Sequence, residues 1–266
     1  MIKVTVAGCS GRMGKRIATL AIQNKKMKLV GAYEYPGHPD IGKDMGDVLG
    51  LEKQDVVVSE SVKESIAQTD VIIDFTSPTA TLETLKLAVK HKKKVVVGTT
   101  GLSKAEQKKI ATASQSIPVV FAPNMSVGVN LLFKISRVVA EALNDEYDIE
   151  IVEAHHKHKK DAPSGTACEL ARQVAAGRKV SLEKKAIYGR EGLCGAREKG
   201  TIGIHAVRGG DVVGDHTVSF LADGERIELT HKASSRDAFA KGSLVAAEYL
   251  DKKKKGLFSM QDVLGI

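Results

Sequence analysis

The sequence predicts an α/β protein of two domains, the first of which is a Rossmann-like, doubly wound parallel sheet. The second is expected to be an α+β domain with a mostly antiparallel, four-stranded sheet. Three features lead to this prediction: apolar strands alternate with helical segments in the first half, a glycine-rich turn joins the first strand to the first helix, and strands of alternating polar and apolar residues fill the second half. With 266 residues, 42% of them hydrophobic, the chain is long enough for two packed cores.

The first strand, Ile2–Ala7, leads directly into a turn with three glycines, Gly8, Gly11 and Gly14, and then into a helix. The spacing is a variant of the dinucleotide-binding pattern, in which the glycines allow a sharp turn, close approach to a pyrophosphate and tight helix–sheet packing. A glycine turn without a ligand is the alternative. The next strand ends in Glu34, 20 positions after Gly14, where such units place the carboxylate that binds the ribose hydroxyls.

The residue after Glu34 bears on the choice between the two nicotinamide dinucleotides. It is Tyr35, at a position where an arginine would favour NADPH, and the Glu34 carboxylate itself repels a 2′-phosphate. We therefore expect NADH to be at least as good a cofactor as NADPH. Three cations near the glycine turn, Arg12, Lys15 and Arg16, could still reach a phosphate.

The rest of the first domain repeats the strand-then-turn pattern, apart from a loop-rich stretch over residues 37–60 with one short strand. The expected strands are Lys28–Glu34, Val56–Val58, Val71–Phe75, Lys94–Val97 and Pro118–Phe121. Ligands of doubly wound sheets bind beyond the carboxyl ends of the strands, so the turns that follow should line the nicotinamide side. These turns are Asp74–Thr76, Gly98–Gly101 and Ala122–Ser126.

The pattern changes after a long helix at Val127–Leu143. The strands expected there are Tyr147–Ala154, Thr201–Val207, Val213–Leu221 and Arg226–His231, with a hairpin at Ala222–Glu225. A last helix, from about Ser234, should return to the first domain, and Arg236 at this crossing either reaches the site or forms an ion pair at the hinge. We therefore predict a dinucleotide-binding domain over residues 1–126, completed by 235–266, and a substrate-binding and oligomerisation domain over residues 127–234.

The second domain opens on the densest group of proton-exchanging and cationic side chains in the sequence. Three histidines and three lysines follow one another: His155, His156, Lys157, His158, Lys159 and Lys160. A helix start comes next, in which Pro163 suits the first turn and Ser164 or Thr166 suits the N-cap. The N–H groups of Gly165 and Thr166, beside the cation Lys159, form a site where a carboxylate or phosphate could bind.

Two other interpretations of this stretch stay open. A basic loop without a function is one, because runs of charge usually face water. Metal binding is the other, since His156 and His158 share a face on an extended segment. The remaining candidate ligands, His205, His216 and His231, are remote in sequence, so no metal site is predicted.

Composition excludes several classes of partner. The formal net charge is +8, but the lysines are dispersed, and 4% aromatic residues with no Trp argue against a base-stacking nucleic-acid surface. Three cysteines without CxxC spacing favour a reducing compartment. No leader pattern and no apolar run of about 20 residues occurs, so we expect a cytoplasmic protein without membrane contacts.

Several motifs together resemble one family, the 4-hydroxy-tetrahydrodipicolinate reductases, formerly called dihydrodipicolinate reductases. The resemblance covers the whole chain and rests on the segments 6–14, 74–76, 98–101, 122–126 and, above all, the long segment 153–167. It implies reduction of a cyclic imine dicarboxylate, 4-hydroxy-tetrahydrodipicolinate, to tetrahydrodipicolinate with NADH or NADPH, in the diaminopimelate and lysine pathway. It also implies a homotetramer built through the sheet of the second domain.

The same resemblance implies roles for individual residues. His155 is expected to be the general acid/base and Lys159 the proton donor, while His156, Gly165 and Thr166 hold the substrate carboxylates. The dinucleotide contacts carried over are Gly8, Cys9, Ser10, Gly11, Arg12, Met13, Glu34, Gly98, Thr99, Thr100, Ala122, Pro123, Asn124 and Met125.

Two rival functions are weighed against this one. Another two-domain dehydrogenase, acting on an amino acid or aldehyde, would share the first domain but need a different acid set, and Cys168 lies inside a predicted helix rather than in a nucleophile's context. A dinucleotide sensor without activity would keep the glycine turn but have no use for the segment from His155 to Thr166.

Overall fold

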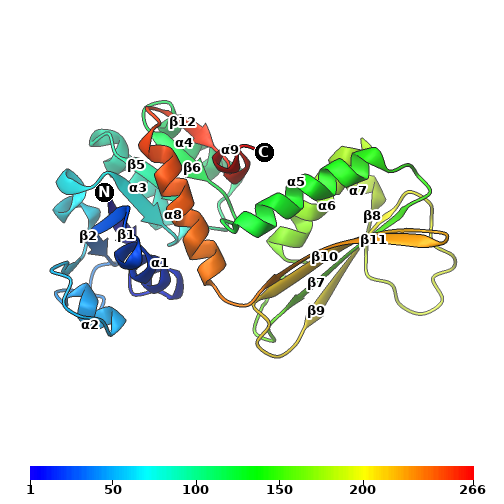
Figure 1. Cartoon of the computed structure of the whole chain (residues 1–266), viewed down its shortest axis with the longest axis horizontal. Coiled ribbons are helices and arrows are strands. Elements are labelled where there is room, and N and C mark those ends of the chain that lie inside the picture. The colour runs from blue at the N-terminus through cyan, green and yellow to red at the C-terminus, as the bar shows by residue number, and fades with distance from the viewer. The chain divides into compact units, whose positions relative to one another are not determined.

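A computed structural model describes all residues from 1 to 266. The chain divides into two compact units, which are described separately (Figure 1). Unit 1 comprises Met1–Val127 and Arg236–Gly265, and unit 2 comprises Gly128–Ser235. No helix in the structure is long and apolar enough to cross a membrane.

Unit 1 is built on a seven-stranded sheet in which every pairing is parallel. Its strands are β1 (Ile2–Ala7), β2 (Met27–Tyr33), β3 (Val58–Ser59), β4 (Val71–Asp74), β5 (Lys94–Val97), β6 (Pro118–Phe121) and β12 (Gly256–Phe258). The order β12-β6-β5-β4-β1-β2-β3 grows outward in both directions from β1. A doubly wound sheet binds its ligand at this reversal, between β1 and β4. The predicted fold class is confirmed.

Four helices of unit 1, α2, α3, α4 and α9, begin at a residue whose side chain caps them. Pro78 occupies the first turn of α3 behind the N-cap Ser77, and Ser103 and Glu106 form a capping box at α4. The helices are α1 (Arg12–Gln23), α2 (Met45–Leu49), α3 (Pro78–Lys90), α4 (Lys104–Ser114), α8 (Asp237–Asp251) and α9 (Met260–Leu264), with short 3₁₀ turns at Val62–Glu64 and Ile66–Gln68.

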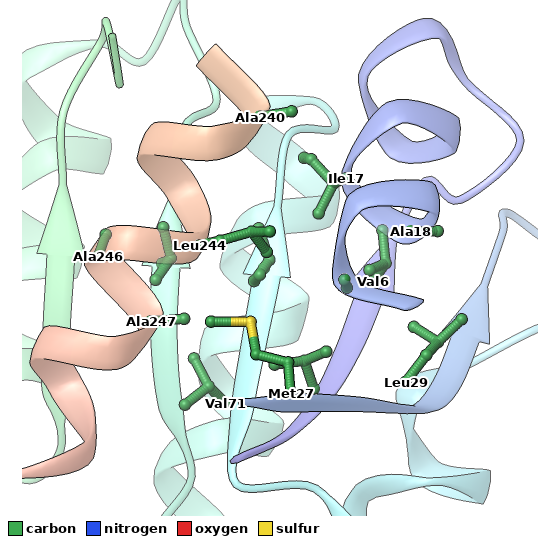
Figure 2. Close-up of a cluster of buried hydrophobic side chains, with 14 of the residues drawn as sticks. Val6, Ile17, Ala18, Met27, Leu29, Val71, Ala240, Leu244, Ala246 and Ala247 are labelled. Carbon is green, nitrogen blue, oxygen red and sulfur yellow. The ribbon is translucent and has the colours of Figure 1, made fainter. Parts of the chain in front are cut away.

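The returning helix α8 completes the core of unit 1. Its buried side chains Leu244 and Ala247 face Ile17 of α1 and Val71 of β4 in one apolar cluster (Figure 2). Gly242 lets it come close, because a Cβ there would lie 1.7 Å from the Met125 carbonyl oxygen. The segment after α8 contains a short strand that the sequence analysis did not predict: β12 pairs with β6 at the edge of the sheet.

Unit 2 has a five-stranded sheet of order β11-β10-β7-β9-β8. Its elements are α5 (Val127–Ala142), β7 (Asp148–His155), α6 (Gly165–Arg178), α7 (Leu182–Lys185), β8 (Ala186–Tyr188), β9 (Ile202–Arg208), β10 (Gly214–Ala222) and β11 (Glu225–Ala233). The expectation of four mostly antiparallel strands needs correction, because β8 is a fifth strand and the pairs β7–β9 and β8–β9 are parallel. Parallel neighbours need crossover connections: α6 and α7 lie between β7 and β8, and the segment 189–201 leads from β8 back to the start of β9.

One face of this sheet is buried and carries both apolar and functional residues. Along β7, Ile149, Ile151, Glu153 and His155 alternate with more exposed residues, as the period of a strand requires. The apolar members pack with α5 and α6 in a core that includes Phe220 of β10. Glu153 and His155 thus lie on the buried face at the carboxyl end of β7.

Candidate active site

The glycine turn of unit 1 is a backbone cradle at the sheet reversal. Gly8 has φ +62°, which favours glycine, and a Cβ there would lie 2.8 Å from Thr76 Cγ2, so the turns after β1 and β4 touch. A Cβ on Gly14 would lie 2.0 Å from the Gly8 carbonyl oxygen, so α1 starts directly against the turn. Gly11 is the N-cap of α1 and offers no side-chain cap, which leaves the amides of the first turn for an anion.

Glu34 lies beside this cradle, as the dinucleotide pattern requires. It is 8% exposed, and its Oε1 accepts a hydrogen bond of 2.8 Å from the Ser10 backbone N–H. A cavity of about 410 Å³ adjoins it and is lined by three carboxylates, those of Glu34, Glu60 and Glu83, and by no lysine or arginine. A group with further negative charge is therefore disfavoured in this cavity.

A second cavity of unit 1, of about 310 Å³, gathers the turns expected on the nicotinamide side. It is lined by Met13, Phe75, Thr76, Gly98, Thr99, Thr100, Pro123, Asn124, Met125 and Phe239. Beneath it the buried Asp74 accepts hydrogen bonds from Thr76 and Thr99, which ties the turns after β4 and β5 together. Phe239 comes from α8 and carries no local signal in the sequence.

Two residues named as dinucleotide contacts, Cys9 and Ala122, belong to the buried core of unit 1 and line neither cavity. Cys9 is fully buried in the core of unit 1, where burial raises the pKa of its thiol to about 12, so only its backbone can face a ligand. Ala122 is buried in the same core. Of the three cations considered for a 2′-phosphate, Arg16 is held in a bidentate ion pair with Asp237 at 2.7 and 2.8 Å.

The polar centre of unit 2 is the carboxylate of Glu153, whose side chain is fully buried. Its Oε2 lies 2.6 Å from His155 Nδ1, and Arg208 donates to both of its oxygens at 2.8 Å. Burial opposes ionisation, but the hydrogen bonds from Arg208, His155 and the Ser164 amide hold the pKa of Glu153 below its usual value. Burial also lowers the pKa of His155, an effect that Glu153 partly offsets.

Lys159 lies in the loop that follows β7. Its Nζ donates to Asp161 Oδ1 at 2.9 Å, and this hydrogen bond lowers the pKa of Asp161. Backbone hydrogen bonds join His156 to Val212 and Lys157 to Gly210, so the loop is anchored at its start.

Helix α6 begins next to these groups. Of the two N-cap candidates, Ser164 is the N-cap and Thr166 is not. The Ser164 hydroxyl accepts a hydrogen bond of 3.1 Å from the Ala167 amide. Gly165 is exposed, and a Cβ there would meet no atom within 4 Å, so a ligand can approach its amide closely. The helix continues to Arg178 and ends at Lys179, which has φ +57°.

The remaining histidines have separate environments. The rings of His156 and His158 lie 6.2 Å apart, and the buried Nδ1 of His156 has no hydrogen-bond partner. His205 pairs with Glu150 at 2.6 Å, and His216 with the Ser164 hydroxyl at 3.0 Å. No group of three or more histidine, cysteine or acidic side chains has the arrangement of a metal site.

His216 gives a prediction on stability. It is 3% exposed, and burial lowers its pKa from 6.5 to about 4. Between pH 6.5 and 4 this histidine binds a proton in the unfolded chain but stays neutral in the folded chain. The free energy of unfolding therefore decreases as the pH falls through this range, by up to about 3 kcal/mol from this group. Urea unfolding of the wild type and of His216→Gln at several pH values measures the difference.

The difference between the two proteins isolates His216 from other groups that titrate in the same range. His216→Gln should flatten the pH dependence of the unfolding free energy between pH 6.5 and 4. The exposed His91→Gln serves as the matched control and should keep the wild-type slope. Equal slopes in the wild type and His216→Gln would contradict the prediction.

A glycine cradle at the reversal of a doubly wound sheet, in a chain whose second unit holds a buried Glu153–His155 pair, is typical of nicotinamide-dependent oxidoreductases. Comparisons with known proteins give the family. The family model "Dihydrodipicolinate reductase, N-terminus" matches residues 2–125, and "Dihydrodipicolinate reductase, C-terminus" matches residues 128–264. The chain belongs to the dihydrodipicolinate reductase family, which confirms the resemblance found in the sequence.

Individual relatives agree with the family models. The chain is 52% identical to the 4-hydroxy-tetrahydrodipicolinate reductase of Magnetococcus marinus, over 99% of this chain and 98% of that protein. It is 49% identical to the enzyme of the same name from Syntrophus aciditrophicus, over 100% and 99% of the two chains. The fold is similar to that of a dipicolinate-bound dihydrodipicolinate reductase from Paenisporosarcina sp. TG-14, with a TM-score of 0.78, 24% identity and 98% of each chain covered. The chain is an NAD(P)H-dependent oxidoreductase, as predicted.

Several residues at these sites have no predicted role. Glu153 had a usable signal, because it lies two positions before His155 on a strand and so shares its face. No sequence signal indicated Arg208, because its place beside His155 follows from the register of β7 on β9. Glu60 and Glu83 reach their cavity only through the packing of unit 1.

Proposed function

We propose that His155 and Lys159 exchange the protons in the reduction of 4-hydroxy-tetrahydrodipicolinate to tetrahydrodipicolinate, the reaction of the diaminopimelate and lysine pathway. The observation that carries this proposal is the buried hydrogen bond from His155 Nδ1 to the Glu153 carboxylate, beside the loop that holds Lys159. It supports a role for His155 as a general acid/base with a defined orientation.

The balance of the reaction shows why an acid is needed. Conversion of the 4-hydroxy compound to tetrahydrodipicolinate takes up one hydride and one proton and releases one water. The reduced dinucleotide, when bound, supplies the hydride and is oxidised. The ammonium of Lys159 is suited to deliver the proton as negative charge develops on the ring. Burial lowers the pKa of His155, which favours the neutral ring and so suits His155 to accept a proton.

The substrate has two carboxylates, and unit 2 offers donors for them. The exposed amide of Gly165 at the start of α6 suits an anion, and Thr166 is the next residue of that turn. His156, with its unpartnered buried Nδ1, is the third group proposed to hold a carboxylate. Binding both ends of the substrate would orient its ring.

The dinucleotide fits the residues of unit 1. The cradle formed by Gly8, Gly11 and the start of α1 suits the pyrophosphate, because a side chain at these positions would fill the space or cover the amides. The Oε2 of Glu34 is available to the ribose hydroxyls, because its other oxygen accepts from Ser10. The turns around the second cavity would hold the nicotinamide.

Cofactor choice gives a prediction of its own. The carboxylates of Glu60 and Glu83 lie with Glu34 around the first cavity. Arg16, one of the cations considered for the 2′-phosphate of NADPH, is already paired with Asp237. We expect kcat/KM to be at least as high with NADH as with NADPH. Replacing both Glu60 and Glu83 with Gln should raise kcat/KM for NADPH and leave the value for NADH unchanged. A strong wild-type preference for NADPH would contradict this expectation.

The activity itself is tested by the oxidation of NADH on addition of freshly generated cyclic imine. Consumption of NADH with this compound, and none with an amino acid or an aldehyde, supports the proposal. Oxidation driven by an aldehyde or an amino acid would instead support another two-domain dehydrogenase. Binding of NADH without turnover of any of the three would indicate a sensor.

We further propose a homotetramer in the cytoplasm, assembled through the sheet of unit 2. The face of that sheet opposite the helices exposes Val152 and Val207, which are 40% and 52% accessible. Exposed apolar residues on a sheet face favour contact with another copy. The mass in solution tests this proposal, and a species of 28.4 kDa alone would exclude it.

A further inference from the structure

The carboxylate of Glu153 accepts four hydrogen bonds inside unit 2. They come from His155 Nδ1 at 2.6 Å, from the Ser164 amide at 3.0 Å and from two guanidinium nitrogens of Arg208 at 2.8 Å each. Removing two charges from water is costly, and apolar residues of the same volume often stabilise a core as well as a buried ion pair does. The pair therefore calls for an explanation other than stability.

The first consequence of these contacts concerns the tautomer of His155. Because Nδ1 faces a carboxylate, Nδ1 carries a proton, and Nε2 is the nitrogen left to exchange one. Nε2 has no hydrogen-bond partner in the structure. Space beside it is kept by Gly214, where a Cβ would lie 3.0 Å from Nε2. The His216 ring packs edge-on at 5.1 Å and limits rotation of the His155 ring.

The second consequence concerns the loop of Lys159. Besides pairing with Glu153, Arg208 donates from its Nη2 to the carbonyl of Asp161 at 2.7 Å. Asp161 is also the residue whose carboxylate receives the Lys159 ammonium. The Glu153–Arg208 pair thus contacts the imidazole, the loop with the ammonium and, through the Ser164 amide, the start of α6.

We propose that Glu153 and Arg208 are positioning residues of the reductase: together they fix the tautomer and orientation of His155 and hold the Lys159 loop and the start of α6 around it. The proposal rests on the function proposed above, because both residues act through His155 and Lys159.

The charged and titratable groups around His155 determine in which direction its pKa should change. They are Glu153 on β7 itself, Arg208 on β9, His216 on β10 and Lys159 in the following loop. Burial lowers the pKa of His155 and the two cations add to this effect, whereas the Glu153 carboxylate raises it. Neutralising Glu153 should therefore shift the titration of His155 to lower pH.

The test compares Glu153→Gln with Glu153→Asp, which keeps the charge on a shorter side chain. For Glu153→Gln we expect kcat to fall about 10- to 100-fold, as for loss of a residue that orients a functional histidine, with an unchanged dissociation constant for NADH. The NMR titration of His155 should move to lower pH. Glu153→Asp should fall between Glu153→Gln and the wild type in both kcat and titration midpoint.

A double variant separates positioning from simple stability. Glu153→Gln alone leaves Arg208, whose side chain is only partly exposed, without its carboxylate partner, which can destabilise the fold. Glu153→Gln combined with Arg208→Gln removes both charges and should restore the thermal midpoint while kcat stays low. Recovery of kcat together with the midpoint would overturn the proposal, because the pair would then serve only the fold.

His155→Asn distinguishes failure of this proposal from failure of the proposed function. If His155→Asn keeps wild-type kcat, the assignment of His155 as general acid/base is wrong. If His155→Asn is inactive while Glu153→Gln keeps both kcat and the His155 titration midpoint of the wild type, the positioning role is wrong and the proposed function stands.

Discussion

Replacing Lys159 with alanine is expected to lower kcat by roughly 10²- to 10⁴-fold, the usual cost of losing a general acid. The dissociation constant for NADH should change little, because the glycine turn and Glu34, which are proposed to bind it, belong to unit 1. Steady-state kinetics with the cyclic imine, together with NADH fluorescence titration, separate the two effects.

Lys160→Ala is the matched control for this variant. Lys160 is the next residue and is exposed, so it has the same charge in the same loop without the contact to Asp161. We expect its kcat to equal that of the wild type. Loss of Asp161's partner in Lys159→Ala should cost little stability, because Asp161 is 62% exposed. Near-normal turnover of Lys159→Ala would exclude Lys159 as the proton donor.

Gly14→Ala is expected to destabilise the fold of unit 1 strongly. The added Cβ would lie 2.0 Å from the Gly8 carbonyl oxygen and 2.7 Å from Cys9 Cα, which are backbone atoms and cannot move aside without displacing the turn. We expect a loss of about 3 kcal/mol or more in unfolding free energy, at or beyond the usual range for overpacking. Urea unfolding measures this loss.

Gly11→Ala, in the same turn, is the control for overpacking. Its Cβ would lie 3.2 Å from the Gly8 carbonyl oxygen, a contact that a small shift relieves, and its φ of −70° suits alanine. We expect this variant to fold with nearly wild-type stability but to bind NADH more weakly, since the methyl group enters the cradle. Equal stability of Gly14→Ala and the wild type would show that α1 does not pack on the turn as described.

Much of the fold of unit 1 could be predicted because its signals are local. Each parallel strand is a continuous apolar run, and each is followed by a turn with glycine, proline or a capping residue. The strand β12 could not be predicted, since a three-residue segment has too short a pattern and gains its pairing only from the edge of β6.

The sheet of unit 2 shows the limit of such signals. Alternation along β9 correctly indicates a strand, but the alternation is the same whether its neighbour runs parallel or antiparallel. The direction is decided by the crossover through α6 and by the register that sets Ile151 opposite Ile204. The same register brings Arg208 to Glu153, which are 55 residues apart in sequence.

By itself, the sequence determined the strand and helix periodicities and the glycine cradle with Glu34. It also contains a motif from Glu153 to Ala167 that is long enough to indicate the family and that places His155 and Lys159 four positions apart. These are properties of neighbouring residues, which a linear pattern records. Only the tertiary structure decided that Glu153 and Arg208 meet behind His155, that Glu60 and Glu83 join Glu34 around a cavity, and that Arg16 is taken up by Asp237. Such partners are set by strand register and helix packing, because these bring together residues whose separation in the chain carries no information about their contact.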